Sequence, residues 1–364
     1  MKITLVGFKG EFTHEIGSGI GRYCYELRNE LANISKDEIE AIEINPLFGK
    51  KIAITKYLAA YKFLLFNRNK TDIIHFLSHN PAVSGKLLKI GDRTRVTIAT
   101  AIEFGYLNNF KTSKIGKQEF IRGTFRPKDY LMWQLLQSIL KGTLGADFLI
   151  AISSQTKEEA VKLGFDKNKI FVVNLGIDKR FMRPIKPREN KENFVVGYLG
   201  GMRKRKNLEF AIKALNVISD PEIRFDIWGK KELEYGDLVS ISKNKNINFK
   251  GFAPEEKIVN IYDSFNVYVH PILYTGFELE ILEAQARGLP VIIYKYGKIP
   301  KEVRKYCFEA KSPEHMAQII EDLKKNGYNE KLRKKATLYA RSFTWEKTAN
   351  ETLDVYKYLY NKVL

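Results

Sequence analysis

The segment HPILYTGFELEILEAQARGLPVI, residues 270–292, contains the end of a buried strand, a loop, a helix and the start of another strand. Gly276 and Phe277 precede the predicted helix, which begins near Glu278, and β-branched residues resume after Pro290. A strand, a helix and a strand in close succession are typical of a parallel sheet with crossover helices. The segment therefore predicts an α/β fold in which a helix N-terminus lies at the carboxyl end of a strand.

The same alternation extends in both directions and is interrupted once. The interruption is RPIKPRENKEN, residues 183–193, which is polar, contains two prolines and is typical of a linker. A chain of 364 residues also exceeds the roughly 250–300 residues at which single cores stop growing. We therefore predict two Rossmann-like, doubly wound domains, residues 1–185 and 186–344, that face each other across a cleft.

The last segment, residues 345–364, has the periodicity of a long amphipathic helix. Its apolar stripe is predicted to contain Thr348, Leu353, Tyr356, Tyr360 and Leu364.

Cysteine content and hydropathy indicate the compartment. Cys24 and Cys307 are the only cysteines, which excludes a disulfide framework and a four-thiolate zinc site. The first residues, MKITLVGFKGEF, resemble a first strand more than a signal peptide, and no apolar run approaches the ~18 residues of a membrane-spanning helix. A cytoplasmic protein is expected, peripheral on the inner face of the cell membrane.

Positive charge is concentrated in the first half of the chain. The net charge is +19, and residues 51–128 contain 15 Lys or Arg but four acidic residues. Nucleic acid, an anionic membrane surface and phosphorylated substrates are all suitable partners for such a stretch, and a solvated basic face with no partner is the simpler alternative. Residues 56–70 and 110–142 mix aromatic and aliphatic residues with cations. This pattern favours docking on anionic lipid over a core helix flanked by lysines.

Three segments have the composition of anion or sugar sites. GSGIGRY, residues 17–23, and YLGGMRKRKNLEF, residues 198–210, each place glycines between a strand and a helix, where backbone amides can approach a phosphate; a plain turn is the alternative for each. Glu283 follows the helix start by about one and a half turns, and its carboxylate can accept two hydrogen bonds from a ribose. Glu278 and Glu280 lie in the first turn, where the helix dipole favours a capping role.

Taken together, these motifs resemble glycosyltransferase family 4, the retaining glycosyl transferases group 1 enzymes of GT-B fold. GIGRY at 19–23 is similar to the family's glycine-rich loop, and NLGIDKRFMRP at 174–184 to the end of its first domain. RKNLE at 205–209, TGFELEILEAQARGLPVI at 275–292 and FTWEKTA at 343–349 resemble the phosphate turn, the donor motif and the final helix that packs back on the first domain.

The resemblance implies a metal-independent hexosyltransferase that uses a UDP- or GDP-linked sugar and a glycan or lipid-linked acceptor, with no cofactor and no nucleic acid. No Asp-x-Asp sequence occurs, in agreement with the absence of a metal. Lys206, which would neutralise the diphosphate, and Glu283, which would hold the ribose, are the expected catalytic residues, and backbone amides from Gly276 to Leu279 would contact the sugar phosphate. The full implied donor set is Gly19, Gly201, Arg203, Arg205, Lys206, Gly251, Phe252, Thr275, Gly276, Phe277, Glu278, Leu279 and Glu283.

The chain departs from the family pattern at three places. Thr275 replaces the first glutamate of the paired-glutamate motif, and Gly201 replaces an arginine for which Arg203 or Arg205 could substitute. Ala99 and Thr100 replace a His-Asp pair near the sugar. We interpret these changes as an altered donor specificity, with a catalytically silent nucleotide-binding homologue as the alternative.

Two further possibilities concern function class. The five histidines show no metal-ligand spacing, and His270 ends a strand where it could touch the base or sugar or be structural. A nucleic-acid-binding protein would explain the charge but not the ordered motifs of the second half.

Overall fold

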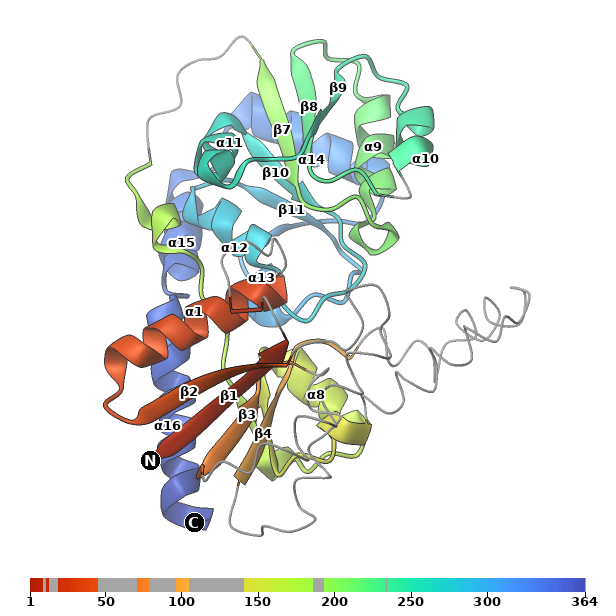
Figure 1. Cartoon of the computed structure of the whole chain (residues 1–364). Helices are drawn as coiled ribbons and strands as arrows, with labels where there is room; N and C mark the ends of the chain where they lie inside the picture. Colours follow the sequence, from red (N-terminus) through yellow and green to blue (C-terminus); the bar gives the residue numbers. More distant parts are fainter. Residues whose placement is uncertain are drawn as a thin grey trace, which may run out of the picture. The chain divides into compact units, whose positions relative to one another are not determined.

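Two six-stranded parallel sheets organise the computed structural model (Figure 1). The structure describes residues 1–8, 11–12, 19–44, 71–78, 96–104, 141–185, 193–232 and 235–363. By packing, the chain divides into unit 1, Met1–Gly176 with Trp345–Leu364, and unit 2, Ile177–Thr344. Most of residues 51–128 and 110–142, and all of 56–70, lie outside the described residues, so lipid docking stays a prediction.

Unit 1 is built on a sheet of order β2-β1-β3-β4-β5-β6. Its described elements are β1 (Lys2–Phe8), α1 (Gly19–Ile34), β2 (Glu38–Ile44), β3 (Ile73–Phe76), β4 (Val96–Ala101), β5 (Phe148–Ala151), α8 (Ser154–Lys162), β6 (Ile170–Val172) and α16 (Trp345–Val363). Every residue of β3 and β4 is buried, as expected for central parallel strands covered on both faces.

The final helix, α16, packs against α1 within unit 1 (Figure 1). Thr348, Leu353 and Tyr356 are buried as predicted, but Tyr360 is 40% exposed, and Leu364 is outside the described residues. The predicted stripe is wrong at Tyr360 because the buried face continues through Leu359, three residues after Tyr356.

A chain of buried hydrogen bonds links the sheet of unit 1 to both of these helices. His75 on β3 contacts Tyr356 Oη at 2.5 Å through Nδ1 and Thr100 Oγ1 at 2.8 Å through Nε2. Thr100 Oγ1 also lies 2.9 Å from Tyr23 Oη on α1. Burial lowers the pKa of His75 to about 3, so the imidazole is neutral. Thr100, which stands in place of one residue of the family's His-Asp pair, contacts both His75 and Tyr23 in this core network.

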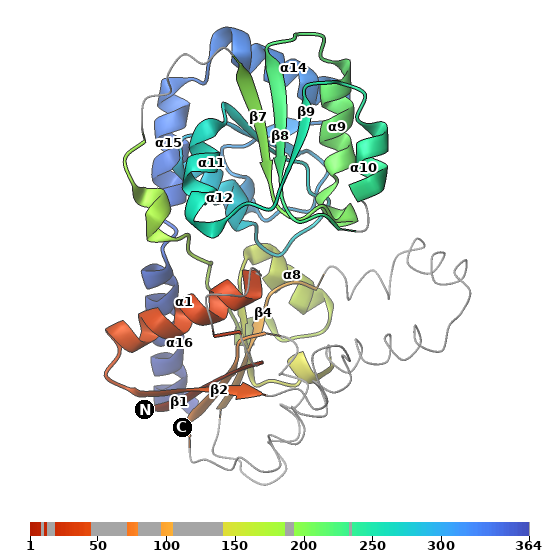
Figure 2. The same cartoon turned by 45° about the horizontal axis from the view of Figure 1, so that its top comes forward.

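Unit 2 has strand order β12-β11-β10-β7-β8-β9. Its strands are β7 (Phe194–Leu199), β8 (Ile223–Trp228), β9 (Ile247–Gly251), β10 (Val267–His270), β11 (Val291–Tyr294) and β12 (Phe308–Ala310). Its helices are α9 (Leu208–Val217), α10 (Tyr235–Ile241), α11 (Ile258–Ser264), α12 (Leu279–Ala286), α13 (Lys301–Arg304), α14 (Pro313–Asn326) and α15 (Glu330–Arg341). Helices α9 and α14 cover one face of the sheet and α11 and α12 the other (Figure 2).

The boundary between the units lies at Gly176, nine residues before the predicted end of the first domain at 185. A buried arginine on the C-terminal side of α12 accounts for the difference. Arg287 donates to the carbonyl oxygens of Arg183 at 2.6 Å and Pro184 at 3.2 Å and pairs with Asp263. These bonds hold the start of the predicted linker against unit 2.

Candidate functional site

The sheet of unit 2 changes direction between β7 and β10. From β7 the chain proceeds outward through β8 and β9, and from β10 it proceeds the opposite way through β11 and β12. In open α/β sheets, ligands bind at the carboxyl ends of the strands at such a switch point. The segments that follow β7 and β10 therefore form the candidate site.

The segment after β7 carries a lysine into this position. Gly200 to Arg203 lead into a 3₁₀ turn, Lys204–Lys206, and Asn207 adopts a left-handed conformation (φ 54°) before α9 begins. The turn directs the side chain of Lys206 inward, where it is 7% exposed. A cation so buried requires anionic partners.

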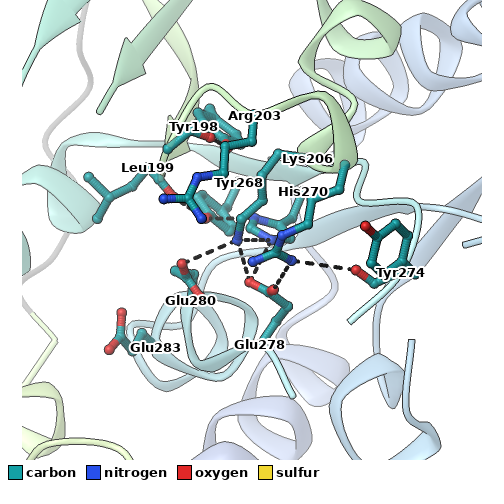
Figure 3. Close-up of polar contacts among 12 residues, drawn as sticks. Tyr198, Leu199, Arg203, Lys206, Tyr268, His270, Tyr274, Glu278, Glu280 and Glu283 are labelled. Carbon is teal, nitrogen blue, oxygen red and sulfur yellow. Dashed lines mark hydrogen bonds and ion pairs between the residues drawn. The ribbon is translucent and has the colours of Figure 1, made fainter. Parts of the chain in front are cut away.

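Those partners come from the segment after β10 (Figure 3). Lys206 Nζ lies 2.6 Å from Glu278 Oε2 and 3.4 Å from Glu280 Oε1. Arg205 Nη1 lies 3.4 Å from Glu278 Oε1, and His270 Nε2 lies 3.1 Å from Glu278 Oε2. Glu278 is thus the centre of a cluster in which two cations face two carboxylates.

The pKa values of the central pair indicate that both groups are charged. Burial disfavours the charged form of Glu278, but Lys206 and then His270 outweigh it and hold the pKa of the carboxyl well below its usual range. Burial likewise lowers the pKa of Lys206, but Glu278 and Glu280 outweigh it and raise it above the ordinary value. The pair therefore stays ionised across the neutral range.

The capping role predicted for Glu278 is wrong. Glu278 is the N-cap residue of α12, with extended backbone (φ −114°, ψ 104°), but its side chain makes no cap hydrogen bond within the described part of the chain. Its carboxylate turns to Lys206 because a full buried cation attracts it more strongly than the partial charge of the helix N-terminus.

Tyrosines of the sheet fix the loop that follows β7. Tyr268 Oη donates to the Leu199 carbonyl oxygen at 2.9 Å, and Tyr198 Oη donates to that of Gly201 at 2.8 Å. Both rings stack on His270, with an interplanar angle of 25° for Tyr268 and 16° for Tyr198. The His270 Nδ1 atom lies 3.0 Å from Tyr268 Oη, so the imidazole connects this loop to Glu278.

Gly229, directly after β8, also shapes this loop. A Cβ atom at Gly229 would lie 1.8 Å from the carbonyl oxygen of Gly200. Only glycine permits this approach of two backbone segments.

Glu283 lies on the same helix as Glu280 and is 3% exposed. Its Oε2 atom accepts a 3.0 Å hydrogen bond from Tyr262 Oη on α11. Burial, followed by the nearby Tyr268 and Glu283, raises the pKa of Tyr262 well above its ordinary value, so the phenol remains a donor. This bond fixes one carboxylate oxygen of Glu283.

The other predicted donor residues of unit 2 have varied environments. Gly251 ends β9 in the left-handed region (φ 79°), and Phe252 beside it is 73% exposed. Thr275 is buried, and its amide donates to the Lys298 carbonyl oxygen. Phe277 packs against Phe343; Gly276 and Leu279 are buried too.

Arg203 and Arg205, which could substitute for the arginine that Gly201 replaces, have different partners. Arg203 is engaged by Glu232, with Nε 2.9 and 3.1 Å from its carboxylate oxygens, and its side chain is 64% exposed. Arg205 lies in the Glu278 cluster. The structure thus groups Arg205, not Arg203, with Lys206. Gly19 begins α1 in unit 1 and is exposed.

Sequence reasoning missed Tyr262 and Gly229, as well as the pairing role of Glu278. A glycine directly after a predicted strand, as in Trp228-Gly229, was a usable signal for a close backbone approach. Nothing in the local pattern around Tyr262 indicated that its hydroxyl would reach Glu283.

A comparison with known families matches most of unit 2. Residues 179–343 match the family model described as glycosyl transferases group 1. These residues make up nearly all of unit 2. The Lys206 cluster, Tyr262 and Glu283 all lie within the matched residues.

Two curated relatives resemble part of the chain. O-antigen chain mannosyltransferase B of Escherichia coli is 23% identical over 259 residues, covering 65% of this chain and 66% of the relative. The UDP-Gal:alpha-D-GlcNAc-diphosphoundecaprenol alpha-1,3-galactosyltransferase of Escherichia coli is 32% identical over 163 residues, covering 40% and 42%. The chain thus spans less than two thirds of the length of either.

Solved structures establish the fold. The Anabaena protein HepE in complex with UDP and glucose superposes with a TM-score of 0.70 at 16% identity, covering 98% of this chain and 99% of that one. The chain has the GT-B architecture, with two α/β domains of six parallel strands each, as predicted.

No group of three or more His, Cys, Asp or Glu side chains that could hold a metal ion occurs among the described residues. No helix in the described ranges combines the length and apolarity needed to cross a membrane.

Proposed function

We propose that this chain is a glycosyltransferase that moves a sugar from a nucleotide-sugar donor to an acceptor hydroxyl, with retention of configuration and without a metal ion. The observation that carries the proposal is the buried Lys206 at the β7/β10 switch point, inside the matched group 1 domain. Relatives named as mannosyl- and galactosyltransferases support the sugar-transfer class.

The proposed roles follow from position. Lys206 and Arg205 would face the donor diphosphate, together with the amides at the N-terminus of α12. Glu283 would accept hydrogen bonds from the ribose hydroxyls, with its carboxylate oriented by Tyr262. Phe252, exposed beside Gly251, would offer a ring face to the base.

In the proposed reaction, the bond between the anomeric carbon and the diphosphate oxygen breaks, and a bond to the acceptor oxygen forms on the same face. The acceptor proton passes to the leaving diphosphate, so no protein base is required. Cations held in place before the reaction stabilise the charge that develops on the leaving group. Lys206 and Arg205 have the charge for this task.

The acceptor is proposed to be a glycan or a lipid-linked saccharide, because one relative is named for a diphosphoundecaprenol-linked acceptor. The basic residues 51–128 would then dock the enzyme on anionic lipid at the cytoplasmic face of the membrane. Liposome co-sedimentation of the full chain at matched salt, against a nucleic-acid gel shift, tests this part.

A catalytically silent nucleotide-binding homologue is the second candidate. It is favoured by Thr275, by Gly201 and by the neutralised state of the Lys206 cluster. Release of nucleoside diphosphate from a panel of UDP-, GDP- and ADP-sugars, with a glycan or lipid-linked acceptor mixture, separates the two candidates. Release above the enzyme-free rate supports transfer, whereas binding without release supports the silent homologue.

Donor identity is a further part of the proposal. Because the buried Thr275 replaces a carboxylate, we expect a donor sugar other than glucose or mannose. If UDP-glucose or GDP-mannose is the best of the panel, this part is wrong.

A further inference from the structure

The Lys206 ammonium group is surrounded by protein groups, and a carboxylate oxygen is the nearest of them. A lysine ammonium group has three N–H donors. Its Nζ atom lies 2.6 Å from Glu278 Oε2, 3.4 Å from Glu280 Oε1 and 3.5 Å from His270 Nε2 (Figure 3). A phosphate oxygen bound to Nζ must also lie at about 2.7–2.9 Å. The phosphate and the Glu278 carboxylate would therefore compete for the same position.

The two anions cannot share the site at low cost. Glu278 and Lys206 are both buried, so water screens the cluster poorly. Like charges placed side by side in such surroundings repel each other strongly. With the carboxylate of Glu280 also present, two negative charges balance those of Lys206 and Arg205 before any ligand arrives.

Glu278 has a second partner within reach. Its Oε1 atom faces Arg205 Nη1 at 3.4 Å, and the Arg205 side chain is 28% exposed, compared with 7% for Lys206. Because Glu278 does not cap α12, no helix-end hydrogen bond has to break when its carboxylate turns. A side-chain rotation could thus move the carboxylate from the buried cation to the more exposed one.

We propose that Glu278 is an internal counter-ion for Lys206 in the empty site, and that a nucleoside diphosphate binds by displacing its carboxylate from Lys206 toward Arg205. The inference rests on the proposed function. Glu278 then sets donor affinity: a ligand must carry enough charge to displace a carboxylate, and a nucleoside without phosphate gains nothing from the exchange.

The test is calorimetric titration of the full chain with UDP, GDP and ADP and with the corresponding nucleosides. Glu278→Gln and Glu278→Gly both remove the competing charge, and circular dichroism melts check that each variant folds. Glu309→Gln is the control, because Glu309 on edge strand β12 forms a 2.6 Å ion pair with Arg304 of α13. The proposal predicts about tenfold or greater tightening for the diphosphate in the Glu278 variants, no change for the nucleosides and no change in the control.

The outcomes separate this inference from the proposed function. If the wild type binds a diphosphate and the Glu278 variants bind it equally or more weakly, the counter-ion role is wrong while the donor site stands. If neither wild type nor variants bind any nucleoside diphosphate, the proposed function fails and the inference fails with it. A crystal structure of the wild-type complex decides independently of variant folding: the proposal requires phosphate at Lys206 Nζ, and a Glu278 carboxylate still bonded there would overturn it.

Discussion

Tyr262 on α11 donates a 3.0 Å hydrogen bond to Glu283 on α12, and both side chains are buried. The bond occupies one carboxylate oxygen of Glu283 and orients the group. A carboxylate fixed in this way can accept ligand hydroxyls without losing further side-chain freedom on binding.

We expect Tyr262→Phe to weaken binding of a nucleoside diphosphate severalfold and to lower the free energy of unfolding by about 1–3 kcal/mol, because a buried carboxylate loses a donor. Calorimetry and urea unfolding measure the two effects. Tyr339→Phe removes a hydroxyl that donates to the Glu302 carbonyl oxygen and is the control. Unaltered ligand affinity in Tyr262→Phe would remove the orienting role.

The Lys206–Glu278 pair makes a prediction about stability. Lys206→Met leaves Glu278 buried without its nearest cation and is expected to destabilise the chain by about 3–5 kcal/mol. The double variant Lys206→Met/Glu278→Leu should recover most of that loss, because no buried charge of the pair remains. Urea unfolding of the wild type, both single variants and the double variant measures the coupling. Additive effects of the two substitutions would contradict it.

Gly229 is predicted to control the loop after β7. Gly229→Ala places a methyl group 1.8 Å from the Gly200 carbonyl oxygen, so the loop or β8 must move. We expect lower stability by about 1–3 kcal/mol and weaker diphosphate binding. Gly236→Ala is the control, since a Cβ there meets no atom within 4 Å. Equal melting temperatures and affinities for the Gly229 variant and the wild type would show that the loop tolerates the shift.

Phe252 offers a test confined to binding. It is 73% exposed, so Phe252→Ala should leave the melting temperature nearly unchanged. If the ring lies against the base, affinity for nucleosides and nucleotides should fall by about 1 kcal/mol. Leu338→Ala, at an equally exposed apolar residue on α15, should change neither quantity. A lower melting temperature with unchanged affinity would indicate a packing role instead.

His75 predicts acid sensitivity in unit 1. Its folded pKa of about 3 lies below the ordinary value of 6.5, so the unfolded chain binds more protons between these values. The contribution of the neutral His75 to the free energy of unfolding is fully present above pH 6.5. It declines as the pH falls toward 3, with a loss of about 2 kcal/mol at pH 5. Hydrogen exchange of β3 and β4 peptides at pH 5 and 7.5 measures it. His75→Gln should abolish this difference and His315→Gln should not; an equal pH dependence in both variants would contradict the assignment.

Local patterns were sufficient for much of unit 2. The helix predicted to begin near Glu278 is α12, which starts at Leu279 with Glu278 as its N-cap residue, and the strand predicted to resume after Pro290 is β11. Strand β2 was missed because, as an edge strand, it carries Glu38, Glu40 and Glu43 and lacks the apolar run of a central strand.

The site could be predicted only in part, for a physical reason. Lys206 and Glu283 were identified because each follows a strand or helix start where ligands bind. Their partners lie 72 and 21 residues away in the sequence, so the Glu278 and Tyr262 contacts follow from strand order and not from local spacing. The cluster appears only once β7 and β10 are neighbours.

Lys206 and Glu283 are proposed to form a nucleotide-sugar donor site. Calorimetric titration of the full chain with a panel of UDP-, GDP- and ADP-sugars tests it most directly, using wild type, Lys206→Ala and Glu283→Ala, with Leu338→Ala as the control. We predict saturable binding by the wild type and the control, and loss of binding by at least about tenfold in both site variants. Unchanged affinity in both site variants would contradict it.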